Sequence, residues 1–217
     1  MPYIFGYGSL IEQSSRLRTT PKAIYVLPAI VPGFARGWWA RTGSIGFSTT
    51  FAGAIPDSSG SINGVVYAVS QQELEDTNKR EQGYTPTDVT DNIQILSGSY
   101  KPKSKVWMYV NDFKPGEKEK SLPTPGFPIV QSYVDICLTG CLQIEAAFPD
   151  DARDFARMFI ESTQAWSEYW ENDRVNPRRP FVSVPAASTI DGLLQNYLPQ
   201  YFSKIQLAPG HWRRSEE

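Results

Sequence analysis

The chain has 217 residues, of which 41% are hydrophobic and 20% charged, and its formal net charge at pH 7 is −2. These values are typical of a folded protein of one domain with room for a smaller appended piece. We expect it to bind neither nucleic acid nor membranes, because it lacks a large basic cluster, an apolar run of roughly 20 residues and the basic start and apolar core of a signal peptide.

The first predicted element is a short strand that leads into a glycine loop. Tyr3–Phe5 is apolar, and Gly6 and Gly8 follow within the run Phe5–Leu10. Glycines let the chain turn sharply and bring its backbone close to a ligand. Successive exposed N–H groups in such a turn form a pocket for a carboxylate or an oxyanion. A Rossmann fingerprint would need a third glycine where Ile11 stands, which disfavours an oxidoreductase that binds a dinucleotide here.

Residues 24–69 predict a β-rich region. β-branched and aromatic residues alternate there with turn residues such as Pro32-Gly33 and the stretch Pro56–Gly60. The nearly continuous apolar run Val65–Val69 is typical of a strand that is buried on both faces. We expect four strands, at Ile24–Val31, Gly33–Arg41, Gly46–Ile55 and Ile62–Val69.

A capping box predicts where the first helix begins. Ser70 stands at the cap with Glu73 three residues later. The helix should run from Gln71 to Glu81, with Gly83 just past its end, where glycine is favoured. The face formed by Leu74, Thr77, Asn78 and Glu81 is poor in apolar residues for a core helix.

Glu81 stands at the negative end of that helix, where a carboxylate is slightly unfavourable. A solvated glutamate would be the ordinary case. If the side chain is buried instead, its pKa would rise and it could act as a base and an acid near neutral pH.

The second half of the chain changes from strands to helices. Two more strands are expected at Val89–Leu96 and Lys105–Asn111, followed by a loop over residues 112–128 that is rich in Pro, Gly and Lys. Val134–Ile144 fits either a strand or a helix that breaks at Gly140.

Two helices are expected after residue 150. Aromatic residues, among them Trp166 and Trp170, recur at helical spacing over residues 150–173, where they should belong to the core. A last helix over residues 188–205 would begin at a capping box, Ser188–Asp191, and be kinked or split at Pro199. Strands first and helices last favour an α+β fold over regular βαβ alternation.

Side chains that usually hold metals or act as nucleophiles are scarce. The single histidine, His211, is close to the C-terminus, where we expect a surface position. Cys137 and Cys141 have no neighbouring histidine to complete a zinc site. We expect them to be small core residues of a reduced, cytosolic protein, with a redox role as the alternative. We therefore expect no metal and no cofactor.

Two separate motifs resemble the γ-glutamylcyclotransferase superfamily, which includes ChaC-type and AIG2-like proteins. The first is Tyr7-Gly8-Ser9-Leu10, and the second, about seventy residues later, is Arg80-Glu81-Gln82-Gly83-Tyr84. Val106–Val110 and Pro128–Tyr133, with Gly140 after it, are similar to the family's later strand and its Pro-x-x-x-x-Tyr helix. The resemblance covers residues 3–141. This chain departs from it at Thr77 and Asn78, where the family often has an apolar residue and an acid.

The resemblance implies a small mixed β-barrel flanked by helices over residues 1–145. A helical C-terminal extension, residues 146–217, would pack on the same domain. The aromatic helix within that extension would either cover the barrel or form the surface of a homodimer.

The resemblance also implies an activity: a cytoplasmic enzyme that cyclises a γ-glutamyl group to 5-oxoproline and releases an amine. Tyr7, Gly8, Ser9 and Leu10 would grip the γ-glutamyl group through backbone N–H groups, and Glu81 would be the general acid/base. Glutathione, γ-glutamyl amino acids and γ-glutamylamines share that group, so the sequence leaves the choice among them open. The rival interpretation is a non-catalytic small-molecule-binding protein on the same scaffold.

Other side chains are candidates for the same site. Tyr84 and Tyr133 either line the pocket or belong to the core. Arg41 either meets a substrate carboxylate or is solvated at the end of a strand. Arg178 and Arg179 either bind a carboxylate or cap the helix before them.

Overall fold

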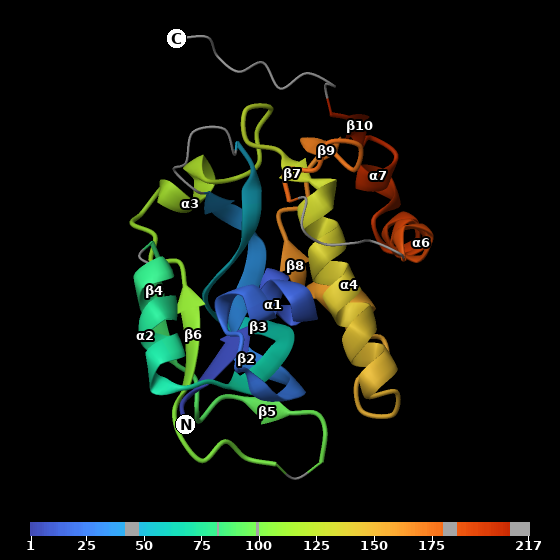
Figure 1. Ribbon diagram of the computed structural model, residues 1–217. Helices are drawn as coiled ribbons and strands as arrows, with labels where there is room; N and C mark the ends of the chain where they lie inside the picture. The colour runs from blue at the N-terminus through green and yellow to red at the C-terminus, as the bar shows by residue number, and fades with distance from the viewer. Residues whose placement is uncertain (42–47, 82, 99, 180–185, 209–217) are drawn as a thin grey trace.

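A mixed sheet forms the centre of the protein (Figure 1). The computed structural model describes residues 1–41, 48–81, 83–98, 100–179 and 186–208. Within them the sheet follows the order β4-β6-β1-β3-β2-β5, with β8 paired to β2. Its strands are β1 (Tyr3–Gly6), β2 (Ile24–Arg41), β3 (Thr50–Ala68), β4 (Thr85–Asp88), β5 (Gln94–Ile95), β6 (Val106–Val110) and β8 (Thr163–Gln164).

The predicted α+β class is confirmed, but the predicted β-barrel is wrong. The order of strands ends at β4 on one side and at β5 on the other, and these two strands are not paired with each other. The sheet is therefore open. The first strand is central: β1 pairs antiparallel with β3 and parallel with β6.

Two long strands replace the four that were expected between residues 24 and 69. β2 and β3 pair antiparallel along almost their whole length, with shifts of register that mark bulges. Pro32 pairs with Ser61 and Phe34 with Pro56, so the intervening turn-like residues bulge out of β3 instead of ending it. The start of the strand expected at Gly46–Ile55 lies outside the described residues. Residues that favour turns therefore occur at irregularities within these strands as well as at strand ends.

The helix predicted from the capping box is confirmed. It is α2 (Gln71–Arg80), in which the backbone N–H of Glu73 donates to Ser70 and the Glu73 carboxylate accepts from the backbone N–H of Ser70. A shorter helix, α1 (Gln13–Thr19), was not expected. The Glu12 side chain caps it by accepting from the backbone N–H of Ser15, at 2.6 Å.

The ambiguous segment around residue 140 is a helix, α4 (Gln131–Ala147), which Gly140 does not break. It is buried almost all round, so it lacks the one-sided pattern that would have distinguished it from a strand. Cys137 and Cys141 lie in it as free, fully buried thiols, which confirms the core position expected for them. His211 lies outside the described residues.

Most of the helix expected over residues 150–173 is absent. α5 covers only Phe155–Ser162, and the chain then turns into β8, where Thr163 pairs with Arg36 of β2. Ala165 has a φ of 58°, which a helix does not allow. Trp166 and Trp170 are in the core as expected, stacked with ring centroids 5.0 Å apart. Their spacing reflects packing against the sheet and not helical periodicity.

The last expected helix is split at Pro199, into α6 (Ala187–Tyr197) and α7 (Pro199–Phe202). The predicted capping box at its start is wrong: Ala186 is the cap, without a side-chain bond, and Asp191 binds Arg174 at 2.8 Å instead. The short elements that remain are a 3-10 turn η1 (Ser9–Ile11), α3 (Glu117–Lys120), and the three strands of a second small sheet, β7 (Ile129–Val130), β9 (Trp170–Asn172) and β10 (Gln206–Leu207).

The main sheet has a separate core on each face. Side chains of α2, α4, α5 and α6 pack with one face, and in Figure 1 α4 runs beside the sheet with α6 on its outer side. Val89 and partly buried residues between 93 and 100 cover the other face. No helix of the described part of the chain is long and apolar enough to cross a membrane.

The contact between α4 and the start of α1 depends on Gly140. A Cβ atom there would overlap the backbone of Ile11 and come within 2.8 Å of Cα of Glu12. We predict that Gly140→Ala lowers the free energy of unfolding by about 1–3 kcal/mol, measured by urea denaturation. Gly192 of α6 has open space around it, so Gly192→Ala should raise stability by about 0.5–1 kcal/mol. Equal effects of the two substitutions would contradict this account.

Candidate active site

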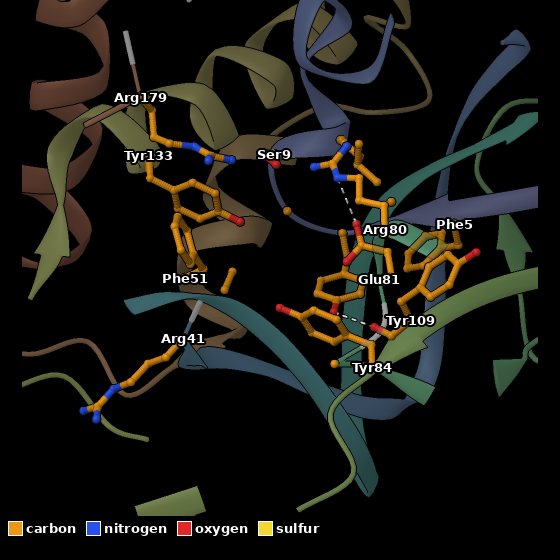
Figure 2. Close-up of a pocket in the computed structure, with 16 residues that line it drawn as sticks. Phe5, Ser9, Arg41, Phe51, Arg80, Glu81, Tyr84, Tyr109, Tyr133 and Arg179 are labelled. Carbon is orange, nitrogen blue, oxygen red and sulfur yellow. Dashed lines mark hydrogen bonds and ion pairs between the residues drawn. The ribbon is translucent and has the colours of Figure 1, made fainter. Parts of the chain in front are cut away.

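A cavity of about 520 Å³ lies between the glycine loop, the end of α2 and the first turn of α4 (Figure 2). All five side chains or backbone positions predicted for the site line it: Tyr7, Gly8, Ser9, Leu10 and Glu81. The structure thus brings together two motifs that are far apart in the sequence. The remaining lining residues are Phe5, Gly6, Arg41, Phe51, Ala52, Arg80, Gly83, Tyr84, Tyr109, Tyr133 and Arg179.

Close packing explains the glycine loop. β1 ends at Gly6, and the 3-10 turn η1 begins directly after Gly8. Gly8 has a φ of −130°, which other residues also adopt, but a Cβ atom there would lie 2.9 Å from the Tyr133 hydroxyl. That hydroxyl also accepts a hydrogen bond from the Ser9 backbone. The close approach of this hydroxyl favours a glycine at position 8.

The glycine loop is not a dinucleotide site of the Rossmann kind. The strand that follows it in sequence is β2, which pairs with β3 and not with β1. A Rossmann loop connects two parallel strands of one sheet through a helix. The dinucleotide interpretation therefore lacks its structural context.

A buried arginine holds the loop from behind. The guanidinium of Arg36 is fully buried and donates to the Tyr7 carbonyl oxygen at 3.0 Å. Burial lowers the pKa of Arg36 to about 10, so the side chain is still charged at neutral pH. Its other acceptors are the Asn63 carbonyl and side-chain oxygens, the Phe159 carbonyl, and the hydroxyls of Ser162 and Thr163. Sequence analysis missed this residue, although an arginine inside an apolar strand is a visible signal.

A chain of phenols links the loop to α2. The Tyr7 hydroxyl donates to the Tyr109 carbonyl at 2.6 Å, and the Tyr109 hydroxyl donates to Oδ1 of Asn78 at 2.7 Å. Thr77 is buried beside it and donates to the Glu73 carbonyl. The two positions at which this chain departs from the family pattern are therefore used to fix α2.

Glu81 is the C-cap of α2, and its backbone N–H donates to the Thr77 carbonyl. Its side chain is 19% exposed, and the carboxylate lies 3.5 Å from Nε of Arg80. Burial raises the pKa of the Glu81 carboxyl above its ordinary value, and the charge of Arg80 opposes part of that rise. Burial and the nearby Glu81 also raise the pKa of Tyr84, to about 12, so its phenol is neutral at physiological pH. The acid therefore faces uncharged hydroxyls.

On the opposite wall of the cavity, an arginine side chain packs over two aromatic rings. The guanidinium of Arg179 lies 5.1 Å from the ring centroid of Phe51 and 5.8 Å from that of Tyr133. In Figure 2 these three side chains face Glu81 and Tyr84 across the cavity. Arg178 does not line the cavity.

Arg178 instead holds the backbone before Arg179 in place. It binds Glu171 and, at 2.9 Å, the Ser48 carbonyl. Arg41 does line the cavity, while its guanidinium donates to the Leu122 carbonyl and lies over the Phe127 ring. Arg41 and Arg179 are thus the arginines that reach the site from outside the two motifs.

Sequence analysis also missed Arg80, Tyr109 and Phe51 as lining residues. Arg80 and Tyr109 stood within segments quoted for the resemblance, so a prediction that extended to whole motifs would have found them. Phe51 carried no local signal. Within the described ranges, no group of three or more His, Cys, Asp or Glu side chains is placed to hold a metal ion.

Comparison with known proteins gives two kinds of match. A family model described as ChaC-like protein matches residues 2–121. A solved structure of a γ-glutamyl cyclotransferase has a TM-score of 0.53 at 13% identity, covering 89% of this chain and 98% of its own. An uncharacterized protein from Homo sapiens has the same TM-score at 12% identity, covering 89% and 97%. At these identities the structures show a shared fold. No curated protein sequence matches the chain.

The raised pKa of Glu81 predicts a stability effect. An acid whose pKa is higher in the folded protein costs stability progressively as pH rises from the unfolded pKa through the folded one. Glu81→Gln removes that cost, so the variant should melt at a higher temperature than the wild type at pH 7. The difference should shrink towards zero near pH 4, where both states hold the proton. Thermal melts at the two pH values measure it.

The control is Glu75→Gln, which changes an exposed glutamate on the same helix. A melting temperature of Glu81→Gln equal to or below that of the wild type at pH 7 would show that the Glu81 carboxylate is not destabilised by its surroundings.

Proposed function

Because the chain belongs to the ChaC-like family, we propose that it is a γ-glutamyl cyclotransferase that converts the γ-glutamyl group of a peptide or amine to 5-oxoproline. One observation carries the proposal. Glu81, with its pKa raised by burial, lines the same cavity as the predicted loop Tyr7–Leu10. A poised acid/base beside a backbone pocket is what an intramolecular aminolysis needs.

The reaction begins with a proton transfer. The α-amine of a free γ-glutamyl compound is mostly protonated at neutral pH, and it becomes a nucleophile only when it loses that proton. In our proposal the Glu81 carboxylate accepts it. A pKa raised above its ordinary value makes this carboxylate a stronger base than a solvated glutamate, and the charge of Arg80 favours its ionised form.

Ring closure follows without any further reactant. The amine nitrogen bonds to the γ-carbonyl carbon, and the carbonyl oxygen carries the negative charge of the tetrahedral intermediate. The bond from that carbon to the leaving nitrogen then breaks as the Glu81 carboxyl group gives its proton to that nitrogen. The ring nitrogen loses its second proton to the Glu81 carboxylate, which passes it to the released amine, so Glu81 ends ionised as it began. The products are 5-oxoproline and the free amine, so no water is consumed and nothing is oxidised or reduced.

The remaining lining residues position the chain of the substrate. An intramolecular attack gains most from being held in a reactive shape, because the two reacting groups are already joined. The backbone of Tyr7–Leu10 would bind the oxyanion or the α-carboxylate. The neutral phenol of Tyr84 is a hydrogen-bond donor close to Glu81, whereas the Tyr109 hydroxyl already donates to Asn78. The two walls of the cavity are fixed by Arg36 from behind and by the Tyr109–Asn78 bond.

We predict that the purified protein releases 5-oxoproline from at least one of glutathione, γ-glutamyl-alanine and γ-glutamyl-ε-lysine. Glu81→Gln keeps the shape of the side chain but cannot accept the proton. It should lower kcat/KM by at least about 100-fold, in the range expected for loss of a general acid/base. Chromatographic measurement of 5-oxoproline checks both statements.

Glu75→Gln serves as the matched control, because it makes the same chemical change at an exposed position of α2. If a folded Glu81→Gln variant kept a substantial fraction of wild-type activity, Glu81 would not be the base. If the wild type bound these compounds but released no 5-oxoproline, the protein would be a binding protein on this scaffold.

A further inference from the structure

The cavity is positively charged in a chain that is negatively charged overall. Among the described residues that line it, three are arginines, Arg41, Arg80 and Arg179, and one is an acid, Glu81. The chain as a whole has a net charge of −2. Such a local excess of positive charge favours an anionic ligand over a neutral or cationic one.

One carboxylate of a γ-glutamyl substrate is already accounted for near Glu81. In the γ-glutamyl group the α-amine and the α-carboxylate are attached to the same carbon atom. If Glu81 takes the proton of that amine, the α-carboxylate also lies at the Glu81 end of the cavity, beside the loop backbone and Arg80. Arg179, on the opposite wall, is then left to face the leaving group (Figure 2).

The structure holds Arg179 firmly in that position. The Asp173 carboxylate accepts from the backbone N–H and the hydroxyl of Ser132, both at 2.7 Å, and from the backbone N–H of Arg178 at 2.8 Å. The backbone N–H of Arg179 donates to the Ser132 hydroxyl at 3.2 Å. Ser132 is in the first turn of α4, one residue before Tyr133. The segment that carries Arg179 is therefore fixed to the same helix end that lines the cavity.

The guanidinium itself is suited to bind an anion. It lies over the rings of Phe51 and Tyr133, which fix its plane while its N–H groups remain directed along that plane. Burial and the nearby Arg80 both lower the pKa of Arg179, and a carboxylate beside the guanidinium would favour its charged form. Arginine binds carboxylates through two parallel hydrogen bonds, which adds direction to the attraction.

We propose that Arg179 binds a carboxylate on the leaving amine, so that the substrate is a γ-glutamyl amino acid or peptide and not a γ-glutamylamine without a carboxylate. This inference rests on the function proposed above. In this inference Arg179 is a specificity-determining residue, and it lies outside residues 2–121, the part of the chain that the family model matches. Arg41 lines the same side of the cavity, but its guanidinium is directed away from it, to the Leu122 carbonyl and the Phe127 ring (Figure 2).

Four compounds test the inference without any change to Arg179. They are γ-glutamyl-alanine, glutathione and the C-terminal amide of each. The amides keep the shape of the leaving group but lose the negative charge of its carboxylate. Binding is measured by calorimetry to Glu81→Gln, which should not turn them over. We expect each amide to bind roughly 10- to 100-fold more weakly than its acid, as for loss of a hydrogen-bonded charge. Amides that bind as well as the acids would overturn the inference.

A double variant assigns the effect to Arg179. In Glu81→Gln/Arg179→Gln the difference in affinity between each acid and its amide should largely disappear, because the positive charge that binds the carboxylate has been removed. Arg157→Gln in the same background is the matched control, since Arg157 is exposed on α5 and pairs with Glu161. A difference that persists in the double variant, or acid and amide affinities that fall equally, would show that Arg179 does not contact the leaving group. Thermal melts establish that each variant is folded.

The two proposals fail in different ways. If the wild type releases 5-oxoproline but does not distinguish acids from amides, the cyclotransferase function stands and the role of Arg179 is refuted. If the wild type releases none, yet the acids bind more tightly than the amides through Arg179, the carboxylate site stands and the proposed reaction is refuted. If none of the four compounds binds, the inference is overturned.

Discussion

The structure depends on the burial of one cation, Arg36, between the sheet and α5. An arginine that is fully removed from water is costly unless each of its N–H groups is bonded. Its hydrogen-bond partners on the loop, β3 and the end of α5 are neutral oxygens, between 2.6 and 3.0 Å away. Hydrogen bonds from a charged donor are stronger than neutral ones. Displacing any one of these elements would leave a buried charge unsatisfied, so the guanidinium fixes the Tyr7 carbonyl and with it the glycine loop.

At Glu81, by contrast, burial raises the pKa of the carboxyl group and so disfavours its charged form. The charge of Arg36 is satisfied by the fold, whereas among the described residues the buried Glu81 carboxylate has Arg80 as its ion-pair partner and lies near the phenols of Tyr84 and Tyr109. Such a group is less stable ionised than it would be in water, and a proton is held more tightly as a result. A residue that costs stability and lines a cavity is more readily explained by function than by folding. The same low-polarity surroundings that penalise the charge would make the carboxylate an effective base.

The parts of the fold that could be predicted from sequence are those set by local chemistry. The capping box Ser70–Glu73 fixed one end of α2, and the distance to Glu81 then placed the acid at the other end. What could not be predicted is long-range pairing. The turn residues within Pro56–Gly60 form a bulge in a strand because β2 continues beside them. α5 ends at Ser162 because Thr163 pairs with β2 in the sheet and its hydroxyl accepts a hydrogen bond from Arg36. Whether a sheet closes into a barrel likewise depends on whether its two edge strands pair, and no local sequence pattern indicates this. For the site, the residues of the two motifs were found, while Arg36 and Phe51 came from segments whose neighbours only the fold reveals.

The part of the chain after residue 121 reaches the proposed active site from two directions. Phe159, Ser162 and Thr163 supply acceptors to Arg36 behind the loop, and Arg179 enters the cavity in front of it. A second, partly buried network fixes that region, in which Arg174 binds the fully buried Asp135 of α4 at 2.7 Å and the partly exposed Asp191 of α6 at 2.8 Å. Breaking a buried ion pair of this kind leaves an uncompensated charge, so the arrangement is held as one unit. The region that the family model does not cover therefore both supports the backbone of the loop and supplies a cation opposite Glu81. In the proposed function, binding of the leaving group would depend on this region, and binding of the γ-glutamyl group on the two motifs.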